Sequence, residues 1–225
     1  MSVAALPPVI AIDGPSASGK GTVAQGVARA LGFHYLNSGA LYRAVAMAAM
    51  GAGAKLDIAS KMSGIALNIN VSFMGNRIEL DGQDVTDAIG SESVGEAASR
   101  VAALPEVRRA LMARQRAFRE PPGLVADGRD MGSVVFPDAA LKIYLTATPE
   151  ERAKRRHKQL MEKGLSATMA ALLGELRERD KRDSERLAAP LKKAEDAVQI
   201  DTTGMSAAEA TAQVLALYKQ VPRAP

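Results

Sequence analysis

The chain has 225 residues, of which 47% are hydrophobic and 24% charged, a balance typical of a globular protein with a large core. It contains no cysteine, which excludes disulfides and thiolate zinc sites and favours a reducing cytoplasm. No apolar run is long enough to span a bilayer. The opening letters, MSVAALPP, lack the basic and apolar regions of a signal peptide, so we expect a cytoplasmic protein.

The net charge of +4 raises the question of a nucleic-acid partner. Residues 150–186 hold 11 of the 29 Lys and Arg residues but also 8 acidic residues, so they form no uniform basic stripe. Four Phe, four Tyr and no Trp leave few rings for base stacking. Two histidines, His34 and His157, are too few for a metal site. We therefore expect no nucleic-acid or membrane partner, and favour a site for small, highly charged anions.

The stretch from Val9 to Leu31, VIAIDGPSASGKGTVAQGVARAL, predicts a strand, a glycine-bounded loop and a helix that Gly32 ends. In this context the GxxxxGK pattern predicts a phosphate-binding loop. Glycines let successive backbone N–H groups converge on an anion, and the helix N-terminus and Lys20 add positive charge. The residues expected to bind the phosphates of ATP are Gly14, Pro15, Ser16, Ala17, Ser18, Gly19, Lys20, Gly21 and Thr22.

One position departs from the general phosphate-loop pattern. Gly21 stands where a Ser or Thr usually binds Mg²⁺, and Thr22 follows it. The resulting GKGT ending is typical of nucleoside monophosphate kinases. We therefore expect Mg²⁺ to be held mainly through phosphates and water, and we assign it no side-chain ligand.

Short apolar strands alternate with helices along the rest of the chain. Beyond the first strand, four more are expected at 33–36, 124–126, 141–145 and 198–200. This alternation predicts an α/β fold in which a five-stranded parallel sheet carries helices on both faces. The segment 67–86 alternates instead between apolar and polar residues, with turns at Gly75-Asn76 and Asp81-Gly82, and predicts a small inserted antiparallel meander.

Polar residues mark the expected helix starts. Asn37 and Ser38 are expected to cap one helix, and Asp57 another. Capping boxes are expected at Ser93–Glu96, Thr148–Glu151 and Ser206–Glu209. Further helices are expected from Pro105 towards Pro121, from 149 to 164 and over about 168–187.

Two groups of charged residues share helix faces. Arg179, Asp183 and Arg186 follow i, i+4, i+7 spacing, and Arg152, Arg155 and Arg156 lie on one side of an earlier helix. For both groups a solvated surface and a ligand site fit the spacing equally well. The segment 127–130 follows a buried strand, so it should meet the phosphate loop at the carboxyl edge of the sheet.

The whole chain resembles the bacterial cytidylate kinases, a branch of the nucleoside monophosphate kinase family. The shared motifs, in family order, are IDGPSASGKGT (12–22), LNSGALYR (36–43), RQRAFRE (114–120), ADGRDMGSVVFPDA (126–139), KIYL (142–145), RERDKRDSERLAAPL (177–191) and IDTTGMS (200–206). The resemblance implies a P-loop kinase core with a small antiparallel nucleoside monophosphate (NMP)-binding insertion and a short helical lid. It also implies a monomer that transfers the γ-phosphate of ATP to CMP or dCMP in pyrimidine nucleotide metabolism.

The resemblance assigns boundaries and site residues as well. The implied core covers 1–62 and 121–225, the NMP-binding insertion about 63–120 and the lid about 150–166. The residues implied to bind CMP are Ser38, Arg43, Ser99, Arg108, Arg129, Asp130, Arg179, Asp183 and Arg186. Those implied in catalysis are Lys20, Arg129, Arg155 and Arg179. Ser38 and Asp183 are expected near the sugar and Arg129 and Asp130 near the base, while Arg155 would approach the ATP phosphates.

The expected reaction is in-line attack of a CMP phosphate oxygen on the γ-phosphorus, with Lys20 and arginines stabilising the charge and no side-chain base. Either Asp13 or Asp127 could orient water on Mg²⁺. Open alternatives are a kinase for AMP, UMP or a non-nucleotide metabolite, and a P-loop switch that signals by conformation. The chain lacks an NKxD-type guanine signature, which counts against a GTPase switch. A basic nucleic-acid binder is the least favoured alternative.

Overall fold

A computed structural model describes residues 6–74, 77–162 and 164–222. The chain divides into two compact units. We call 1–36, 117–185 and 189–225 the core unit, and 37–116 with 186–188 the insertion unit. The insertion unit begins at residue 37, whereas the NMP-binding insertion expected from the sequence begins at about 63, and that expected boundary stays a prediction. Among the described residues, no helix combines the length and apolar content needed to cross a membrane.

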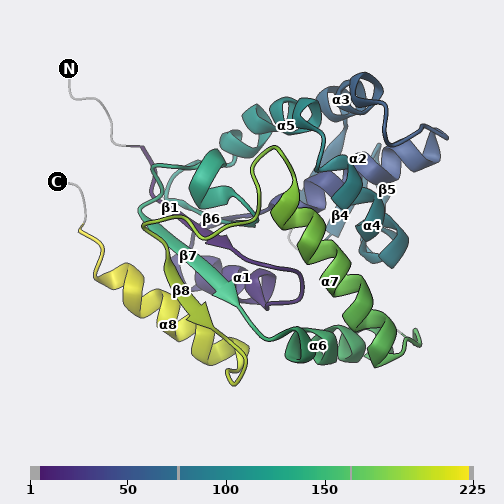
Figure 1. Ribbon diagram of the computed structural model, residues 1–225. Helices are drawn as coiled ribbons and strands as arrows, with labels where there is room; N and C mark the ends of the chain where they lie inside the picture. Colours follow the sequence, from purple (N-terminus) through teal and green to yellow (C-terminus); the bar gives the residue numbers. More distant parts are fainter. Residues whose placement is uncertain (1–5, 75–76, 163, 223–225) are drawn as a thin grey trace, which may run out of the picture. The chain divides into compact units, whose positions relative to one another are not determined.

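The core unit is built on a five-stranded sheet with the strand order β2-β6-β1-β7-β8 (Figure 1). The strands are β1 (Val9–Asp13), β2 (His34–Asn37), β6 (Leu124–Gly128), β7 (Leu141–Thr146) and β8 (Val198–Asp201). β1 pairs in parallel with β6 and β7, and β7 with β8. All five expected strands are present, and the expected parallel α/β fold is confirmed.

The register of the sheet aligns the carboxyl ends of β1, β6 and β7. Asp13, the last residue of β1, lies opposite Gly128 of β6 and Tyr144 of β7. The loop after β1 and the segment after β6 therefore leave the sheet at the same carboxyl edge, as the strand pattern predicts.

Helices α1 (Lys20–Leu31) and α8 (Ala207–Lys219) lie side by side and cover one face of the sheet (Figure 1). Their buried side chains, such as Val27 and Val214, join alternate strand residues such as Ile10 in one apolar cluster. The two helices approach closely at Gly26, where an added Cβ would lie 2.9 Å from Oγ1 of Thr211. Small residues at this crossing thus fix α1, and with it the loop that opens into it.

The opposite face of β1 carries the π-helical turn η2 (Met131–Val135). Ala11 and Lys142 point away from α1, because strand side chains alternate between faces. A Cβ on Gly132 would meet both of these side chains, at 3.4 and 3.1 Å. The segment after β6 therefore packs directly on the sheet beneath the carboxyl edge.

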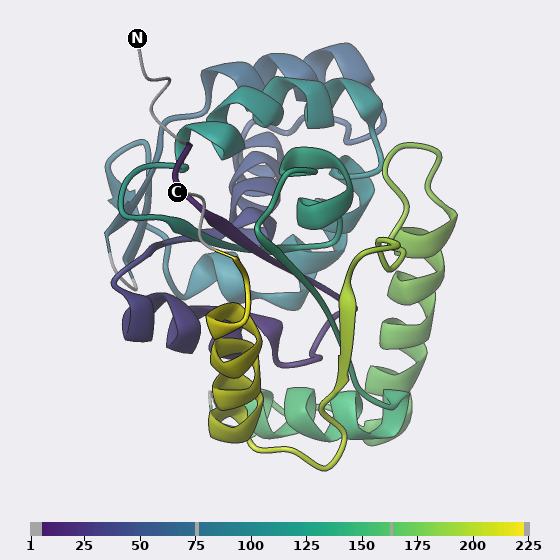
Figure 2. The same ribbon diagram turned by 90° about the vertical axis from the view of Figure 1, so that its left-hand side faces the viewer.

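Two charged helices complete the core unit, α6 (Pro149–Glu162) and α7 (Met169–Glu185). They pack on each other through Ala153, Leu160, Leu172 and Leu176, and Figure 2 shows them in green as a consecutive pair. Thr148 accepts a hydrogen bond from the Glu151 amide at the start of α6, as expected. Gly164, with φ of 71°, follows its end. The capping box at Ser206 and Glu209 is confirmed as the start of α8.

The insertion unit contains helices and the expected antiparallel meander. Its helices are α2 (Ser38–Gly51), α3 (Ala59–Asn68), the 3₁₀ turn η1 (Ala88–Gly90), α4 (Glu92–Val101) and α5 (Pro105–Ala117), whose last residue falls in the core unit. The meander consists of β3 (Val71–Met74), β4 (Arg77–Leu80) and β5 (Gln83–Asp84). Asp81 and Gly82 both have positive φ, 52° and 79°, and form the second expected turn. The first, Gly75-Asn76, lies outside the described residues.

Three predicted caps in the insertion unit are corrected. Ser91, not Ser93, caps α4, and its Oγ accepts the Val94 amide hydrogen at 3.4 Å. Helix α3 follows Ile58 without a side-chain cap, so Asp57 does not cap it. Asn37 caps α2, as expected, by accepting from the amide of Ala40 at 3.0 Å, whereas Ser38 is the first residue of the helix rather than its cap. Because several polar residues stand near each helix start, the sequence could not tell which one adopts the extended backbone of a cap.

Candidate active site

The loop between β1 and α1 is tightly turned and passes close to the backbone of the neighbouring strand β7. An added Cβ on Gly14 would lie 2.0 Å from the carbonyl oxygen of Leu145, so only glycine fits beside the neighbouring strand. Gly19 has φ of 90° and precedes the first residue of α1. Inside the turn, the hydroxyl of Ser18 is fully buried and has no hydrogen-bond partner among the residues that the structure describes. A loop with these features presents backbone donors to an anion, as the glycine pattern predicts.

Lys20 lies at the base of this loop. Its Nζ donates a hydrogen bond to the carbonyl oxygen of Pro15 at 3.1 Å. Burial lowers the pKa of Lys20 to about 7, with Arg129 and Arg179 adding to the effect and Asp127 opposing it. A lysine in such surroundings gains full charge when an anion binds beside it. The electrostatics therefore favour a polyanionic ligand at the loop.

Arg129, directly after β6, links the loop to helix α7. Its Nε donates to Oδ2 of Asp183 at 2.8 Å, and its Nη2 donates to Oγ of Ser16 at 2.8 Å. A third bond runs from Nη1 to the carbonyl oxygen of Gly128 at 3.2 Å. Arg129 and Asp183, two residues assigned by resemblance to one site, are thus in direct contact within the core unit.

Helix α6 contributes two more arginines to the loop. Arg152 is buried and donates to the carbonyl oxygen of Ser16 at 3.2 Å and to Asp180 at 2.5 Å. Arg155 donates to the carbonyl oxygen of Ser18 at 3.3 Å and to that of Thr202 at 2.6 Å. The spacing of these arginines left a solvated surface and a ligand site equally open. In the structure both contact the phosphate loop.

The two candidate carboxylates at the loop have different surroundings. Asp13 accepts hydrogen bonds from the backbone amides of Met131 and Gly132, both at 2.8 Å, and burial raises its pKa to about 6. Burial also raises the pKa of Asp127, while the nearby Lys20 and the Tyr35 hydroxyl, which donates to Asp127 at 2.6 Å, act to lower it. Both oxygens of Asp13 thus hold the start of η2, whereas Asp127 lies beside the loop lysine.

In the insertion unit, Arg43 on α2 is held by two backbone carbonyls. Its Nη1 donates to Ile89 at 2.8 Å and to Ser91 at 3.0 Å. The guanidinium lies against Gly95 of α4, where an added Cβ would be 2.7 Å from Nη2. The fold thus fixes the direction of this arginine.

Arg108 on α5 is buried over an aromatic ring. Its guanidinium lies 5.5 Å from the ring centroid of Tyr42, and Nη1 donates to the carbonyl oxygen of Ala102 at 3.2 Å. The Tyr42 hydroxyl accepts from buried Gln115 at 3.5 Å. Ser99 on α4 is buried in the same unit.

The residues that resemblance assigns to CMP divide between the two units. The core unit holds Arg129, Asp130, Arg179 and Asp183, and the insertion unit holds Ser38, Arg43, Ser99, Arg108 and Arg186. Within the core unit Arg129 contacts Asp183, and within the insertion unit Arg43 and Arg108 are held by backbone carbonyls. Asp130 and Ser38 are buried in their respective units. The joint site remains a prediction.

Sequence reasoning missed three residues that contact or border the loop: Tyr35, Arg152 as a loop ligand, and Thr202. Thr202 follows β8, so the strand-end rule could have found it. Tyr35 lies on β2, and the spacing of Arg152 left a solvated surface and a ligand site equally open. Neither position has a pattern that identifies its partner.

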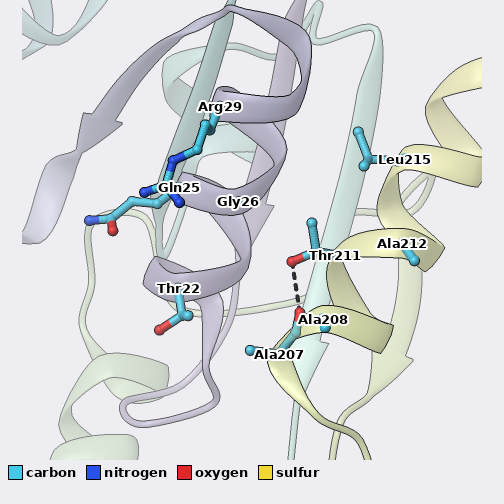
Figure 3. Close-up of a pocket in the computed structure, with 9 residues that line it drawn as sticks. All are labelled: Thr22, Gln25, Gly26, Arg29, Ala207, Ala208, Thr211, Ala212 and Leu215. Carbon is cyan, nitrogen blue, oxygen red and sulfur yellow. Dashed lines mark hydrogen bonds between the residues drawn. The ribbon is translucent and has the colours of Figure 1, made fainter.

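A pocket of about 440 Å³ lies between α1 and α8 (Figure 3). Thr22, Gln25 and Arg29 line it from α1, and small α8 residues form the other wall. Thr211, on that wall, donates its hydroxyl hydrogen to the carbonyl oxygen of Ala207 at 2.7 Å. Thr22 is the member that this pocket shares with the phosphate loop.

A glycine-bounded loop with a partly buried lysine, at the carboxyl edge of a parallel sheet and surrounded by arginines, defines a P-loop kinase. A solved gluconokinase from Sinorhizobium meliloti has the same fold, with a TM-score of 0.50 and 16% identity over 96% of this chain and 93% of that chain.

The family model for cytidylate kinase matches residues 10–220. Cytidylate kinase of Nitrosomonas eutropha is 58% identical over 94% of this chain and 94% of its own length. That of Nitrosomonas europaea is 56% identical over 96% of this chain and 97% of its own. The chain belongs to the cytidylate kinase family.

Proposed function

We propose that the chain transfers the γ-phosphate of ATP to CMP and dCMP, giving CDP or dCDP and ADP, in pyrimidine nucleotide metabolism. The observation that carries this proposal is the phosphate loop with its partly buried Lys20, in a chain that belongs to the cytidylate kinase family over nearly its whole length. The loop supports the triphosphate donor, and family membership supports the acceptor.

The donor phosphates are assigned to the loop of residues 14–22. Backbone N–H groups at the start of α1 face the anion, and Lys20 exchanges the carbonyl of Pro15 for a phosphate oxygen. Arg155 now donates to the carbonyl oxygen of Ser18, so a small movement of its guanidinium would bring it to the same phosphates.

Mg²⁺ is assigned to the donor phosphates and to water held by Asp127. The donor set fits this assignment, because Asp127 is a buried carboxylate near Lys20 and Gly21 offers no hydroxyl. No group of three or more His, Asp or Glu within the described ranges forms a protein cage for a metal. When bound, Mg²⁺ neutralises charge on the triphosphate.

The acceptor is assigned to residues from both units. Ser38 and Asp183 are proposed to bind the sugar, and Arg129 and Asp130 the base. The further groups proposed to bind CMP are Arg43, Ser99, Arg108, Arg179 and Arg186. Arginine suits this role because its planar guanidinium binds phosphate oxygens in pairs.

The residues act on the reaction by position and charge. The attacking oxygen of CMP is already ionised at neutral pH, so no side chain needs to remove a proton. Lys20, Arg129, Arg155 and Arg179 would stabilise the negative charge that spreads over the transferred group. We further propose that the chain acts as a monomer in the cytoplasm, with these nucleotides as its partners and no nucleic acid or membrane.

The decisive experiment measures ADP formation from ATP with Mg²⁺ and CMP, dCMP, UMP or AMP as acceptor. We expect turnover with CMP and dCMP, a loss of at least 100-fold in Lys20→Ala, and an increase mainly in the KM for CMP in Asp183→Ala. Turnover that favours AMP would overturn the assignment of CMP as the acceptor. Hydrolysis of ATP without an acceptor would favour a nucleotide-dependent switch.

A further inference from the structure

Tyr35 joins strand β2 to the carboxylate next to the phosphate loop. Its hydroxyl donates to Oδ2 of Asp127 on the neighbouring strand β6 at 2.6 Å, a short bond typical of an ionised acceptor. The amide of Gln25, on the exposed side of α1, hydrogen-bonds to the same hydroxyl. A relay therefore runs from Gln25 through Tyr35 to Asp127.

This pair lies where the phosphate loop departs from its general pattern. An added Cβ on Gly21 would lie 3.4 Å from Oδ2 of Asp127 and 3.7 Å from the Tyr35 hydroxyl. The general pattern has Ser or Thr at this position, with a hydroxyl for the metal. Here Gly21 has no side chain, and the space beside it is occupied by Tyr35 and Asp127, which belong to strands of the sheet.

The apolar packing around Tyr35 requires its ring but does not require its hydroxyl. The ring of Tyr35 packs against the apolar cluster between the sheet and α1, and Phe33, two residues earlier in the chain, packs against the same cluster without a hydroxyl. Phenylalanine would therefore fill the space at position 35. The polar atom adds only the bond to Asp127 and the contact with Gln25.

We propose that Tyr35 is a positioning residue for phosphoryl transfer: it fixes Asp127 through Oδ2, so that the carboxylate would hold water on the Mg²⁺ of the donor nucleotide. This inference rests on the proposed function. Without the bond to Tyr35, the carboxylate can rotate towards the ammonium of Lys20, with which it already interacts electrostatically. Both groups would then be less available to the nucleotide.

The test compares Tyr35→Phe with wild type in direct nucleotide binding. We expect the affinity for ADP in the presence of Mg²⁺ to fall about tenfold, as expected for a lost hydrogen bond to a charged group. The affinity for ADP in EDTA should change less than twofold. Under saturating substrates kcat should fall by a similar factor, while the KM for CMP stays the same.

Two single variants and one double variant test whether Tyr35 has a merely structural role. Tyr218→Phe removes a hydroxyl from a ring that packs on Phe33 in the same cluster, and it should behave as wild type. Gln25→Leu changes an exposed residue, so it leaves folding intact. It should weaken the binding of ADP in the presence of Mg²⁺ in the same direction as Tyr35→Phe, but only two- to threefold. In an Asp127→Asn background, Tyr35→Phe should have no additional effect.

Equal binding of Mg²⁺–ADP by Tyr35→Phe and wild type would overturn the inference, as would equal losses with and without Mg²⁺. Additive losses in the double variant would overturn it too. Because these readouts need no acceptor, they stand even if CMP proves not to be the acceptor. Failure of the proposed function would appear instead as absent CMP turnover in the wild type.

Discussion

Lys20 is only partly charged in the free protein near neutral pH. Burial and nearby arginines lower its pKa to about 7, so at pH 8 most molecules of the free protein hold a neutral amine. A bound phosphate reverses this shift, because the anion stabilises the ammonium. Binding of Mg²⁺–ADP at pH 8 should therefore take up close to one proton, and at pH 6 almost none. Calorimetry in buffers of different ionisation enthalpy measures this number.

The matched control is Lys20→Arg, because a guanidinium stays charged throughout this pH range. This variant should show no uptake at either pH. If wild type and Lys20→Arg take up the same number of protons at pH 8, then another group titrates and Lys20 is charged in the free protein.

Gly95 determines where Arg43 can lie. A methyl group at this position would meet the guanidinium at 2.7 Å, so Gly95→Ala must displace Arg43 from the carbonyls of Ile89 and Ser91. We expect the KM for CMP to rise about tenfold, the loss of roughly one charge-assisted hydrogen bond. The KM for ATP should stay unchanged in steady-state assays.

Gly64→Ala provides the comparison, since Gly64 is also helical and a Cβ there meets nothing within 4 Å. Both changes gain similar helix propensity, about 1 kcal/mol, so they differ only in the contact with Arg43. A similar rise in the KM for CMP in both variants would assign the effect to the helices rather than to the arginine.

At the scale of elements, Asp13 holds the start of η2, but its burial lowers the free energy of unfolding near neutral pH. Burial raises its pKa from 3.8 to about 6, against the effect of the two amides it accepts from. Because the folded-state pKa is the higher one, the stabilising contribution is fully present below pH 4 and is lost as pH rises through 6. The shift corresponds to roughly 3 kcal/mol.

Asp13→Asn removes this titration while keeping the size of the side chain. The free energy of unfolding of wild type, relative to Asp13→Asn, should therefore fall by roughly 3 kcal/mol between pH 4 and pH 7. Urea denaturation at several pH values measures the difference. A constant difference across this range would show that Asp13 keeps its usual pKa.

The elements that the sequence predicted well are those with strong periodic patterns. The strands, the phosphate loop, the meander and the cap at Ser206 follow from apolar spacing and from glycine or serine at fixed offsets. The caps of α3 and α4 were misplaced, because neighbouring polar residues compete locally and tertiary packing selects one.

Contacts between distant segments could not be read from the chain. The bond from Tyr35 to Asp127 spans 92 positions, and that from Arg152 to Ser16 spans 136. Local spacing gives the face of an element but not its partner in the fold. Resemblance to a family supplied the CMP residues, yet it did not indicate which backbone and side-chain acceptors hold those arginines.

At the scale of the molecule, the chain passes between its two units several times, and the proposed sites divide unevenly between them. The donor loop belongs wholly to the core unit. The proposed CMP residues come from both. The two nucleotides should therefore protect different parts of the chain from hydrogen exchange. This difference can be measured separately in the segments of each unit.

Mg²⁺–ADP at 100 times its dissociation constant should slow exchange by up to about 100-fold in the core-unit segment 14–31, with little effect on 38–51 and 92–108. CMP alone should slow exchange in these insertion-unit segments and in 129–135. Mass spectrometry of peptic fragments measures both patterns. Lys20→Met should abolish the ADP pattern and keep the CMP pattern, because the lysine belongs to the donor loop alone. Protection by CMP confined to the core unit would contradict the assignment of Arg43, Ser99 and Arg108, and would place the acceptor entirely among the residues after β6 and on α7.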